Sequence, residues 1–303
     1  QVEQVIVLSC YVWRALADQT SSSLPGRARW GKAGADMKGH AMLHPIAEDL
    51  IAHVLHRDSN VIVLNKPPGL ASHGGPKTYF HVDAYLPDLK FGIQPEPTLA
   101  HRLDRDTAGC LLLCRHPKSS KKITRLFTEK KIGKTYWAVV RGAMADDHGF
   151  IDAPIGKINY ESGWTMLVHE DGQPSKTEYK VLGRGKDADG KDISWLELIP
   201  HTGRTHQLRV HLDHVGHPVV GDPFYGRGDE PPIFGAPPTL MLLSRQIIVP
   251  FHADRDPVIV DAPPPELMRP GLSACGYNGD YAAHATSIDA QYTGDDSDTE
   301  GRQ

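Results

Sequence analysis

The residues His101-Arg102-Leu103-Asp104-Arg105-Asp106-Thr107 place one carboxylate, Asp104, between two arginines. Cationic side chains at these positions favour the charged form of a carboxylic acid, so we expect Asp104 to stay ionised even if it is buried. An ionised carboxylate is what a nucleophilic catalyst needs. The competing interpretation is an ordinary cluster of arginine and aspartate in a turn, and the rest of the chain has to decide between the two.

Four further stretches of sequence accompany this loop. They are Leu64–Leu70 (LNKPPGL), Lys134–Gly142 (KTYWAVVRG), Thr202–Arg209 (TGRTHQLR) and Gly216–Gly226 (GHPVVGDPFYG). With these blocks, over roughly residues 55–250, the chain resembles the RluA-like branch of the RluA/RsuA-type pseudouridine synthases, enzymes that isomerise uridine within RNA. It departs from the family's pattern after Thr107, where Ala108–Cys110 replace the usual Ser and, two positions further on, Leu.

The resemblance implies catalytic roles for three residues, acting on a uridine that is flipped out of the RNA. Asp104 would be the nucleophile, attacking either the sugar C1′ or the uracil C6. Tyr136 would pack on the uracil and relay a proton, although a buried core tyrosine is the competing interpretation. Arg209 would pair with Asp104, with Arg204 as the second candidate, and a bidentate pair would fix the direction of the carboxylate as well as its charge.

Substrate binding is expected from four cations: Arg102, Arg105, Arg204 and Lys66. The resemblance implies that Arg102, two residues before the nucleophile, enters the RNA where the base has left, because its planar charged head suits both stacking and phosphate contact. A structural ion pair is the alternative for Arg102. Lys66 is expected to line the substrate groove together with the turn at Gly74 and Gly75, although that turn can need glycine only for its backbone angles.

The distribution of charge matters more than its sum, because a formal net charge of −4 is unpromising for a protein that binds RNA. Residues 286–303 hold five acids and one base, so the remainder of the chain is formally neutral. Between Arg115 and Gly142, nine basic residues stand against one acid, and this local charge of +8 could hold a phosphate backbone. A solvated helix face is the usual explanation of such a run, but its position between Asp104 and Tyr136 favours RNA binding. The cations expected on the RNA backbone are Lys118, Lys121, Lys122, Arg125, Lys130, Lys131 and Lys134.

Composition indicates one substantial core, since the chain has 303 residues of which 40% are hydrophobic. The cysteines at positions 10, 110, 114 and 275 are scattered and suggest neither a disulfide framework nor a zinc site, so we infer a reducing, intracellular compartment. No run approaches the length of a membrane span, and the first residues lack both a Met and a signal peptide. Loss of an organellar transit peptide would explain this start, as would truncation, so a mitochondrial location is expected with the cytoplasm as the alternative.

The order of apolar and polar stretches indicates three parts. These are an N-terminal extension (1–45) without a clear S4-type RNA-binding module, a catalytic domain (46–262), and a Pro/Gly-rich then acidic tail (263–303) expected to be disordered or bound to a partner. Apolar periodicity predicts helices over 46–55, from Pro117 onward and over 205–215, and strands over 61–64, 111–113, 136–140, 177–182, 194–199 and 240–249. Many strands with few interleaved helices indicate an α+β fold with a mixed, largely antiparallel sheet and flanking helices.

A cluster of histidines suggests a metal site, because His201, His206, His211, His214 and His217 lie close together in sequence. The stretch lacks HExxH and an accompanying cysteine pair, and the implied isomerisation needs neither metal nor redox chemistry, so we expect no cofactor. The expected partner is structured RNA, either ribosomal RNA or tRNA, and with it a ribosomal or pre-ribosomal particle. The rival functions are an RNA-binding or ribosome-assembly factor on the same fold, whose catalytic activity is dispensable, and a histidine-based metal hydrolase.

Overall fold

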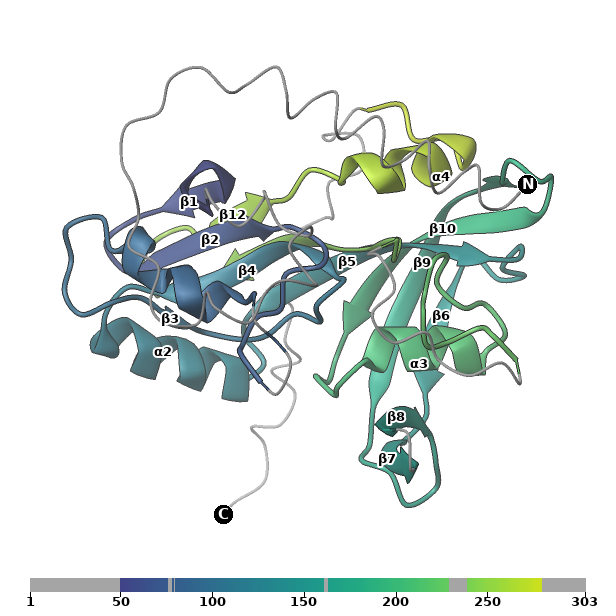
Figure 1. Cartoon of the computed structure of the whole chain (residues 1–303), viewed down its shortest axis with the longest axis horizontal. Coiled ribbons are helices and arrows are strands. Elements are labelled where there is room, and N and C mark those ends of the chain that lie inside the picture. Colours follow the sequence, from purple (N-terminus) through teal and green to yellow (C-terminus); the bar gives the residue numbers. More distant parts are fainter. Residues whose placement is uncertain (1–49, 76–77, 79, 161–162, 229–238, 280–303) are drawn as a thin grey trace, which may run out of the picture. The chain divides into compact units, whose positions relative to one another are not determined.

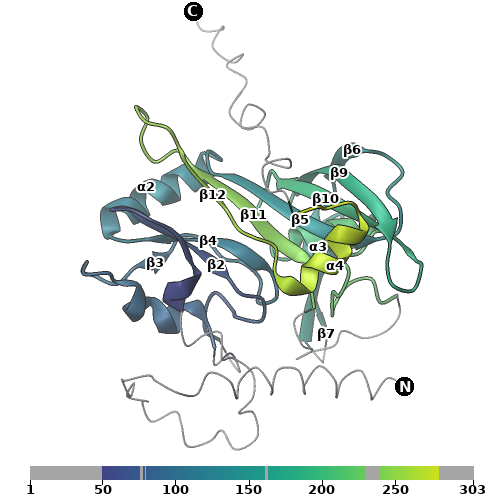
Figure 2. The ribbon, with the colours of Figure 1, turned by 90° about the horizontal axis from the view of Figure 1, so that it is seen from above.

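One long mixed β-sheet organises the folded part of the chain (Figure 1). The structure is a computed structural model that describes residues 50–75, 78, 80–160, 163–228 and 239–279. Within these residues the sheet has ten strands, of which eight follow the order β1-β2-β4-β11-β5-β10-β9-β6, while β12 pairs with β11 and β3 pairs with β4 (Figure 2). Strands β7 and β8 form a separate two-stranded sheet.

The strands are β1 (Val54–Arg57), β2 (Val61–Lys66), β3 (Thr98–Leu99), β4 (Ala108–Cys114), β5 (Gly133–Arg141), β6 (His148–Asp152), β7 (Ile155–Tyr160), β8 (Gly163–Val168), β9 (Lys176–Lys186), β10 (Asp192–Pro200), β11 (Leu242–Val249) and β12 (Val258–Asp261). The α-helices are α2 (Pro117–Thr128), α3 (Gln207–His214) and α4 (Arg269–Ala274), and two 3₁₀ helices are η3 (Val82–Leu89) and η4 (Glu266–Met268).

Pairing in the long sheet is antiparallel except where β4 and β11 run parallel. In that parallel pair Ala108 faces Leu243 and Gly109 faces Ser244. Gly109 has a φ of +102°, and a Cβ there would collide with the carbonyl oxygen of Ser244, so only glycine lets β11 approach this closely. The predicted α+β class with a mixed, largely antiparallel sheet is confirmed.

The central strand β4 is buried on both faces, which explains its apolar sequence. Leu111 and Leu113 point to a core cluster that includes residues of η3 and α3, whereas Cys110 and Leu112 point to a second cluster that includes residues of α2 and α4. Helices α3 and α4 therefore lie on opposite faces of β9 and β10 (Figure 1).

Helix α2 begins where the sequence predicts. Pro117 lies in its first turn, where a backbone N–H would have no acceptor within the helix, so the proline costs no hydrogen bond. His116 and Ser119 form a reciprocal capping box. Ile123 and Leu126 are buried against the sheet, and basic residues occupy the opposite face. None of the described helices is long and apolar enough to cross a membrane.

Two predictions about the ends of the folded region are wrong. Residues 50–53 form one turn of 3₁₀ helix and 54–57 form strand β1, so the predicted helix over 46–55 does not continue to its end, because Val54 pairs with Leu64 of β2. The ordered chain also continues beyond residue 262 into η4 and α4, and Leu272 of α4 and Tyr277 after it are buried. The apolar contacts of this segment with Trp137 and Trp195 stabilise it in spite of its Pro/Gly-rich sequence. The predicted N-terminal extension and residues 280–303 lie outside the described residues.

The hairpin of β7 and β8 packs on helix α3 through its own small cluster. Ile155, Val210 and Tyr225 are buried there, with Met166 and Val168 of β8 against them. Helix α3 thus carries the hairpin on one side while its N-terminal end faces the Asp104 loop, and this arrangement builds the site described below.

Candidate active site

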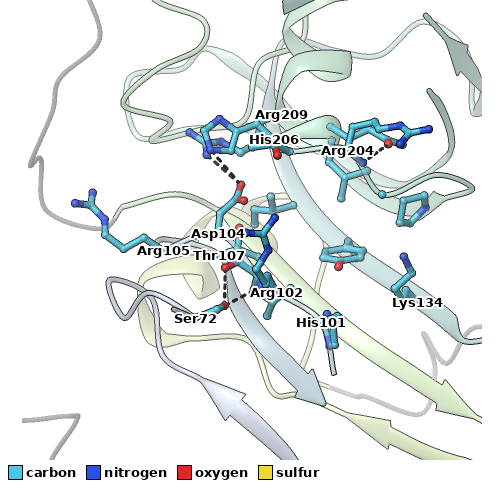
Figure 3. Close-up of a pocket in the computed structure, with 18 of the residues that line it drawn as sticks. Ser72, His101, Arg102, Asp104, Arg105, Thr107, Lys134, Arg204, His206 and Arg209 are labelled. Atoms are coloured by element: carbon cyan, nitrogen blue, oxygen red, sulfur yellow. Dashed lines mark hydrogen bonds and ion pairs between the residues drawn. The ribbon is translucent and has the colours of Figure 1, made fainter. Parts of the chain in front are cut away.

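A pocket of about 690 Å³ opens between the Asp104 loop, strand β5 and the start of α3 (Figure 3). This volume suits a small ligand or a nucleotide. Among the described residues that line it, Asp104 is the one carboxylate, and five are lysine or arginine: Arg102, Arg105, Lys134, Arg204 and Arg209. A pocket with this lining attracts a polyanion and presents a single carboxylate to it.

The loop that carries Asp104 is held by hydrogen bonds from two directions. Ser72 Oγ donates to the Leu103 carbonyl oxygen at 2.8 Å and accepts from the Leu103 N–H at 3.0 Å. The backbone N–H of Thr107 donates to the carbonyl oxygen of Asp104 at 3.2 Å, which closes a turn just before β4 begins. The sharp turn between these anchors exposes the Asp104 side chain to the pocket.

Arg209 and Asp104 form the ion pair that the sequence predicts, but with a different geometry. Arg209 Nη1 lies 3.1 Å from Asp104 Oδ2, and the Arg209 side chain is only 3% exposed. Its bidentate partner is Asp222, fully buried, whose two oxygens accept from Nε and Nη2 at 2.7 Å each. The predicted bidentate pair with Asp104 is therefore wrong: Asp222 fixes the guanidinium, which turns one remaining N–H to Asp104. These charges raise the pKa of Arg209 against the effect of burial, so it stays cationic.

Lys66 does not line the pocket, contrary to the prediction. Its side chain is completely buried, and Nζ donates to the carbonyl oxygens of Pro67, Leu70 and Arg105 at 2.9, 2.7 and 2.9 Å. Burial lowers its pKa to about 7, against the charges of Asp106 and Asp104, which raise it. Lys66 ties the turn after β2 to the Asp104 loop, because an amine among apolar strands needs these carbonyls as partners.

The other cations of the predicted binding set all lie at the pocket. Arg102 is exposed, and among the described residues it has no ion-pair partner, which argues against the structural alternative. Arg105 makes a bidentate pair with Asp106, with both distances 2.8 Å. Arg204 donates to the Pro174 carbonyl oxygen at 3.4 Å and does not pair with Asp104.

Tyr136 lies in the pocket wall and is also buried, so the two interpretations of this residue describe the same side chain. It stands on β5, where the hydroxyl has a hydrogen bond with Ser244 of β11. Burial raises the pKa of this phenol above its usual range, so it carries its proton at neutral pH.

Lys134 differs from the other cations of the basic stretch because it lies at the pocket. It is half-buried in the pocket near His101, whereas Lys118, Lys121 and Arg125 are exposed on α2. In Figure 3, Lys134 and His101 lie toward the opposite side of the drawn pocket from Arg209. Burial, with the charge of Lys134, lowers the pKa of His101 to about 3, and its Nε2 accepts from the Leu112 N–H at 3.0 Å.

The cations after α2 are exposed too, and part of their charge is offset. Glu129 makes ion pairs with Arg125 at 3.2 Å and Lys131 at 3.0 Å. Lys130 is exposed, whereas Lys122, on α2, is half-buried with its Nζ 4.7 Å from the centre of the Phe251 ring. The structure thus keeps a cationic face along α2, and it buries Arg115 of the same stretch against backbone carbonyls.

Sequence reasoning missed three side chains of this site. His206 lies beside Asp104, with Nε2 3.9 Å from Oδ2, and its ring stacks on Trp164 of β8 at a centroid distance of 5.6 Å. The Tyr225 hydroxyl oxygen lies 2.8 Å from the other ring nitrogen of His206, Nδ1. In the sequence this histidine belongs to the Thr202–Arg209 stretch and to the histidine cluster, and nothing there places the β7–β8 hairpin next to it.

Two other histidines of that cluster have different partners. His211 is buried between Thr177 Oγ1 at 2.8 Å and the Ala153 carbonyl oxygen at 2.9 Å. His201 pairs with Glu178 on the neighbouring strand at 3.0 Å. In the described part of the chain, no group of three or more His, Cys, Asp or Glu residues could hold a metal ion.

Comparison with known proteins shows the family to which the chain belongs. Residues 60–214 match the family model described as RNA pseudouridylate synthase. The chain is 35% identical over 221 residues to an uncharacterized RNA pseudouridine synthase of Zymomonas mobilis, covering 72% of this chain and 96% of that protein. It is 37% identical over 182 residues to ribosomal large subunit pseudouridine synthase C of Buchnera aphidicola, covering 60% of this chain and 56% of that protein. The solved structure of human RNA pseudouridylate synthase domain containing 4 superposes with a TM-score of 0.60 at 26% identity, covering 75% of this chain and 94% of that one. The chain therefore belongs to the RNA pseudouridylate synthase family.

Proposed function

We propose that this chain converts uridine to pseudouridine in structured ribosomal RNA or tRNA, with Asp104 as the nucleophile. The observation that carries the proposal is the arrangement of Asp104, Arg209 and Asp222. Asp104 is 27% exposed at the wall of a cationic pocket, and a buried arginine with its own buried counter-ion directs an N–H at one of its oxygens. A carboxylate held in this way is oriented and open to a substrate.

The reaction needs no net change in atoms. Asp104 attacks C1′ or adds to C6, the bond between N1 and C1′ breaks, and the base turns so that C5 bonds to C1′. The hydrogen on C5 then leaves as a proton, N1 gains a proton, and the carboxylate is released. The target base has to leave its helical stack to reach the pocket.

The surrounding residues suit this reaction. Tyr136, protonated and next to the pocket, is proposed to pack on the uracil. Arg102, exposed, is proposed to enter the RNA where the base has left, while Arg204 and Arg105 contact the substrate at the mouth. The exposed cations of α2 and of the following turn are proposed to bind phosphates further along the RNA.

The rival function, an RNA-binding or assembly factor whose activity is dispensable, explains the cationic surface but not the site. A protein that only binds RNA has no need of a carboxylate fixed by two buried charges inside a pocket that attracts anions. Binding to a ribosomal or pre-ribosomal particle is part of the proposal. A mitochondrial location stays a prediction, because the first 49 residues lie outside the described part of the chain.

Release of tritium tests the proposal directly. Transcripts of ribosomal RNA and tRNA labelled at uracil C5 would be incubated with the wild type, D104N and D104A, and tritium in solvent would be counted. We expect release by the wild type and a loss of at least about 1,000-fold in both variants, because the nucleophile is removed. RNA binding, measured by filter retention, should change little in D104N, which keeps the volume of the side chain. Equal release by wild type and D104N would contradict the role of Asp104, and RNA binding without any release would favour the assembly factor.

A further inference from the structure

One buried ring beside Asp104, the imidazole of His206, has no role in the proposed reaction. The His206 side chain is only 14% exposed, its Nε2 lies 3.9 Å from Asp104 Oδ2, and its Nδ1 lies 2.8 Å from the Tyr225 hydroxyl. Figure 3 shows His206 and Arg209 on the same side of Asp104. If Nε2 carries a hydrogen, it attracts the carboxylate; if Nε2 carries a lone pair, it repels the carboxylate.

The Tyr225 hydroxyl lies against Nδ1 of His206, while Nε2 faces Asp104. Its phenol oxygen has hydrogen bonds with the Thr165 side chain and the Met166 backbone, and both lower the pKa of Tyr225. Burial outweighs them and raises that pKa to about 12, so the phenol keeps its own hydrogen at neutral pH. A phenol hydrogen donated to Nδ1 leaves the proton of a neutral His206 on Nε2, facing Asp104.

The surroundings of His206, taken together, favour the neutral form of its ring. Burial lowers its pKa, and Arg209 lowers it further, whereas Asp104, Asp222 and Asp106 raise it. Trp164 of the β7–β8 hairpin, which stacks on the ring, is uncharged. The net direction is downward, so the imidazole is uncharged at neutral pH.

The orientation of the ring is fixed as well. Trp164 stacks on it at an interplanar angle of 30°, and Phe224 lies against it at 6.0 Å. The backbone of His206 is left-handed, with a φ of 55°, at the residue just before α3. A non-glycine residue adopts this conformation rarely, and here it turns the imidazole from the start of α3 toward the Asp104 loop.

The two oxygens of Asp104 therefore have different surroundings. Oδ2 accepts from Arg209 Nη1 at 3.1 Å and faces His206 Nε2, while Oδ1 has no hydrogen-bond partner among the described residues. The 3.9 Å separation is too long for a hydrogen bond in the free protein, but such contacts commonly shorten when substrate closes an active site.

We infer that His206 accepts a hydrogen bond from Tyr225 at Nδ1 and carries its proton on Nε2. In this form it is a positioning residue that, together with Arg209, binds Oδ2 of Asp104 and leaves Oδ1 as the attacking atom. This inference rests on the proposed function, because it assumes that Asp104 is the nucleophile. It also gives the β7–β8 hairpin a role: Thr165 and Met166 fix the hydroxyl of Tyr225, and Trp164 fixes the ring of His206.

Two substitutions at one position separate this role from a structural one. In H206Q the amide nitrogen lies near the position of Nε2, whereas in H206N it lies near that of Nδ1. Asparagine tolerates the left-handed backbone better than glutamine, so a purely structural role favours H206N. We expect H206Q to keep kcat for tritium release within about threefold of the wild type and H206N to lose about 10- to 100-fold, with KM little changed in both. A kcat in H206N equal to or above that of H206Q would overturn the inference.

The tautomer itself can be observed without activity. In ¹⁵N-labelled protein, the ring nitrogens of His206 are identified as the signals lost in H206Q, and their shifts report which nitrogen is protonated. We expect the Nε2–H form in the wild type and a mixture of forms in Y225F; a wild-type ring protonated on Nδ1 would overturn the inference. The D104N comparison above tests the proposed function on its own, so failure of one is distinguishable from failure of the other.

Discussion

Asp222 shows how one residue outside the pocket can control the residue inside it. The D222N substitution would replace one acceptor oxygen with an amide N–H that faces an arginine donor and would leave Arg209 buried without a full counter-ion. We expect unfolding free energy to fall by about 3 kcal/mol, since breaking a buried pair leaves an uncompensated charge. Tritium release should fall too, because Arg209 is then free to turn away from Oδ2. Urea denaturation measures the first effect.

The matched control for that experiment is the exposed pair of Glu266 and Arg269, at 3.1 Å. E266Q removes the same charge from a pair that water already screens, so its effect on stability should stay below about 1 kcal/mol. Equal losses in E266Q and D222N would contradict the view that Asp222 acts as a buried counter-ion.

Lys66 predicts a pH dependence of stability. Its pKa in the folded protein is lowered to about 7 from 10.5, so between these values the unfolded chain holds a proton that the folded chain has released. Stability therefore rises with pH across this window, and the cost of burying the ammonium is fully present below pH 7. We expect the unfolding free energy of the wild type, relative to that of K66M, to increase from pH 7 to pH 10. A difference that stays constant with pH would show that Lys66 does not titrate in this range; K180M, at an exposed lysine, serves as the control.

At the scale of elements, helix α2 is where RNA binding can be separated from catalysis. Lys118 and Lys121 are exposed on this helix, and Lys180 and Lys191 are equally exposed on and after β9. We expect K118Q/K121Q to weaken RNA binding and to reduce the slope of log K against log salt by about 0.9 for each lost phosphate contact. The double variant K180Q/K191Q, which removes the same charge, should leave the slope near its wild-type value. Titrations at several salt concentrations measure both; equal slopes in the two variants would show that α2 does not contact the RNA backbone.

The elements differ in how well their sequence specifies them. Strands β2 and β4 and helix α2 follow from local patterns, because their apolar residues and the proline that begins α2 leave few alternatives. The helix predicted over 46–55 fails because pairing with β2 outweighs local propensity at residues 54–57. Helix α4 was missed because its stability comes from tryptophans more than seventy residues earlier in the chain, which no local pattern reveals.

The residues of the site also differ in how well the local sequence specifies their roles. The loop with Asp104 and the arginine that reaches it can be read from motifs, since each depends on a short stretch with a defined backbone. The roles of Asp222, His206 and Tyr225 depend on how the chain returns after α3 and on where the hairpin packs. Lys66 was assigned to the wrong environment because sequence alone does not show that its side chain turns inward.

At the scale of the whole described fold, the C-terminal segment closes over β9 and β10. A Cβ on Gly183 would collide with the carbonyl oxygen of Cys275, and one on Gly185 with that of Ala274. We expect G183V to lower the unfolding free energy by about 1–3 kcal/mol, because the segment must move away from the sheet. G203A, where added volume meets nothing within 4 Å, is the control for stability. Thermal unfolding of both variants measures the difference, and equal melting temperatures would contradict tight packing of this segment.

The position of β11 has a consequence for synthesis of the chain. This strand hydrogen-bonds β4 on one side and β5 on the other, so it joins the half of the sheet that carries Asp104 to the half that carries Tyr136. Its residues, Leu242–Val249, leave the ribosome after every described residue of the pocket except Leu242 itself. The two walls of the pocket are therefore made early and joined late, and a nascent chain halted before residue 242 holds all the residues assigned to chemistry without yet having an active site.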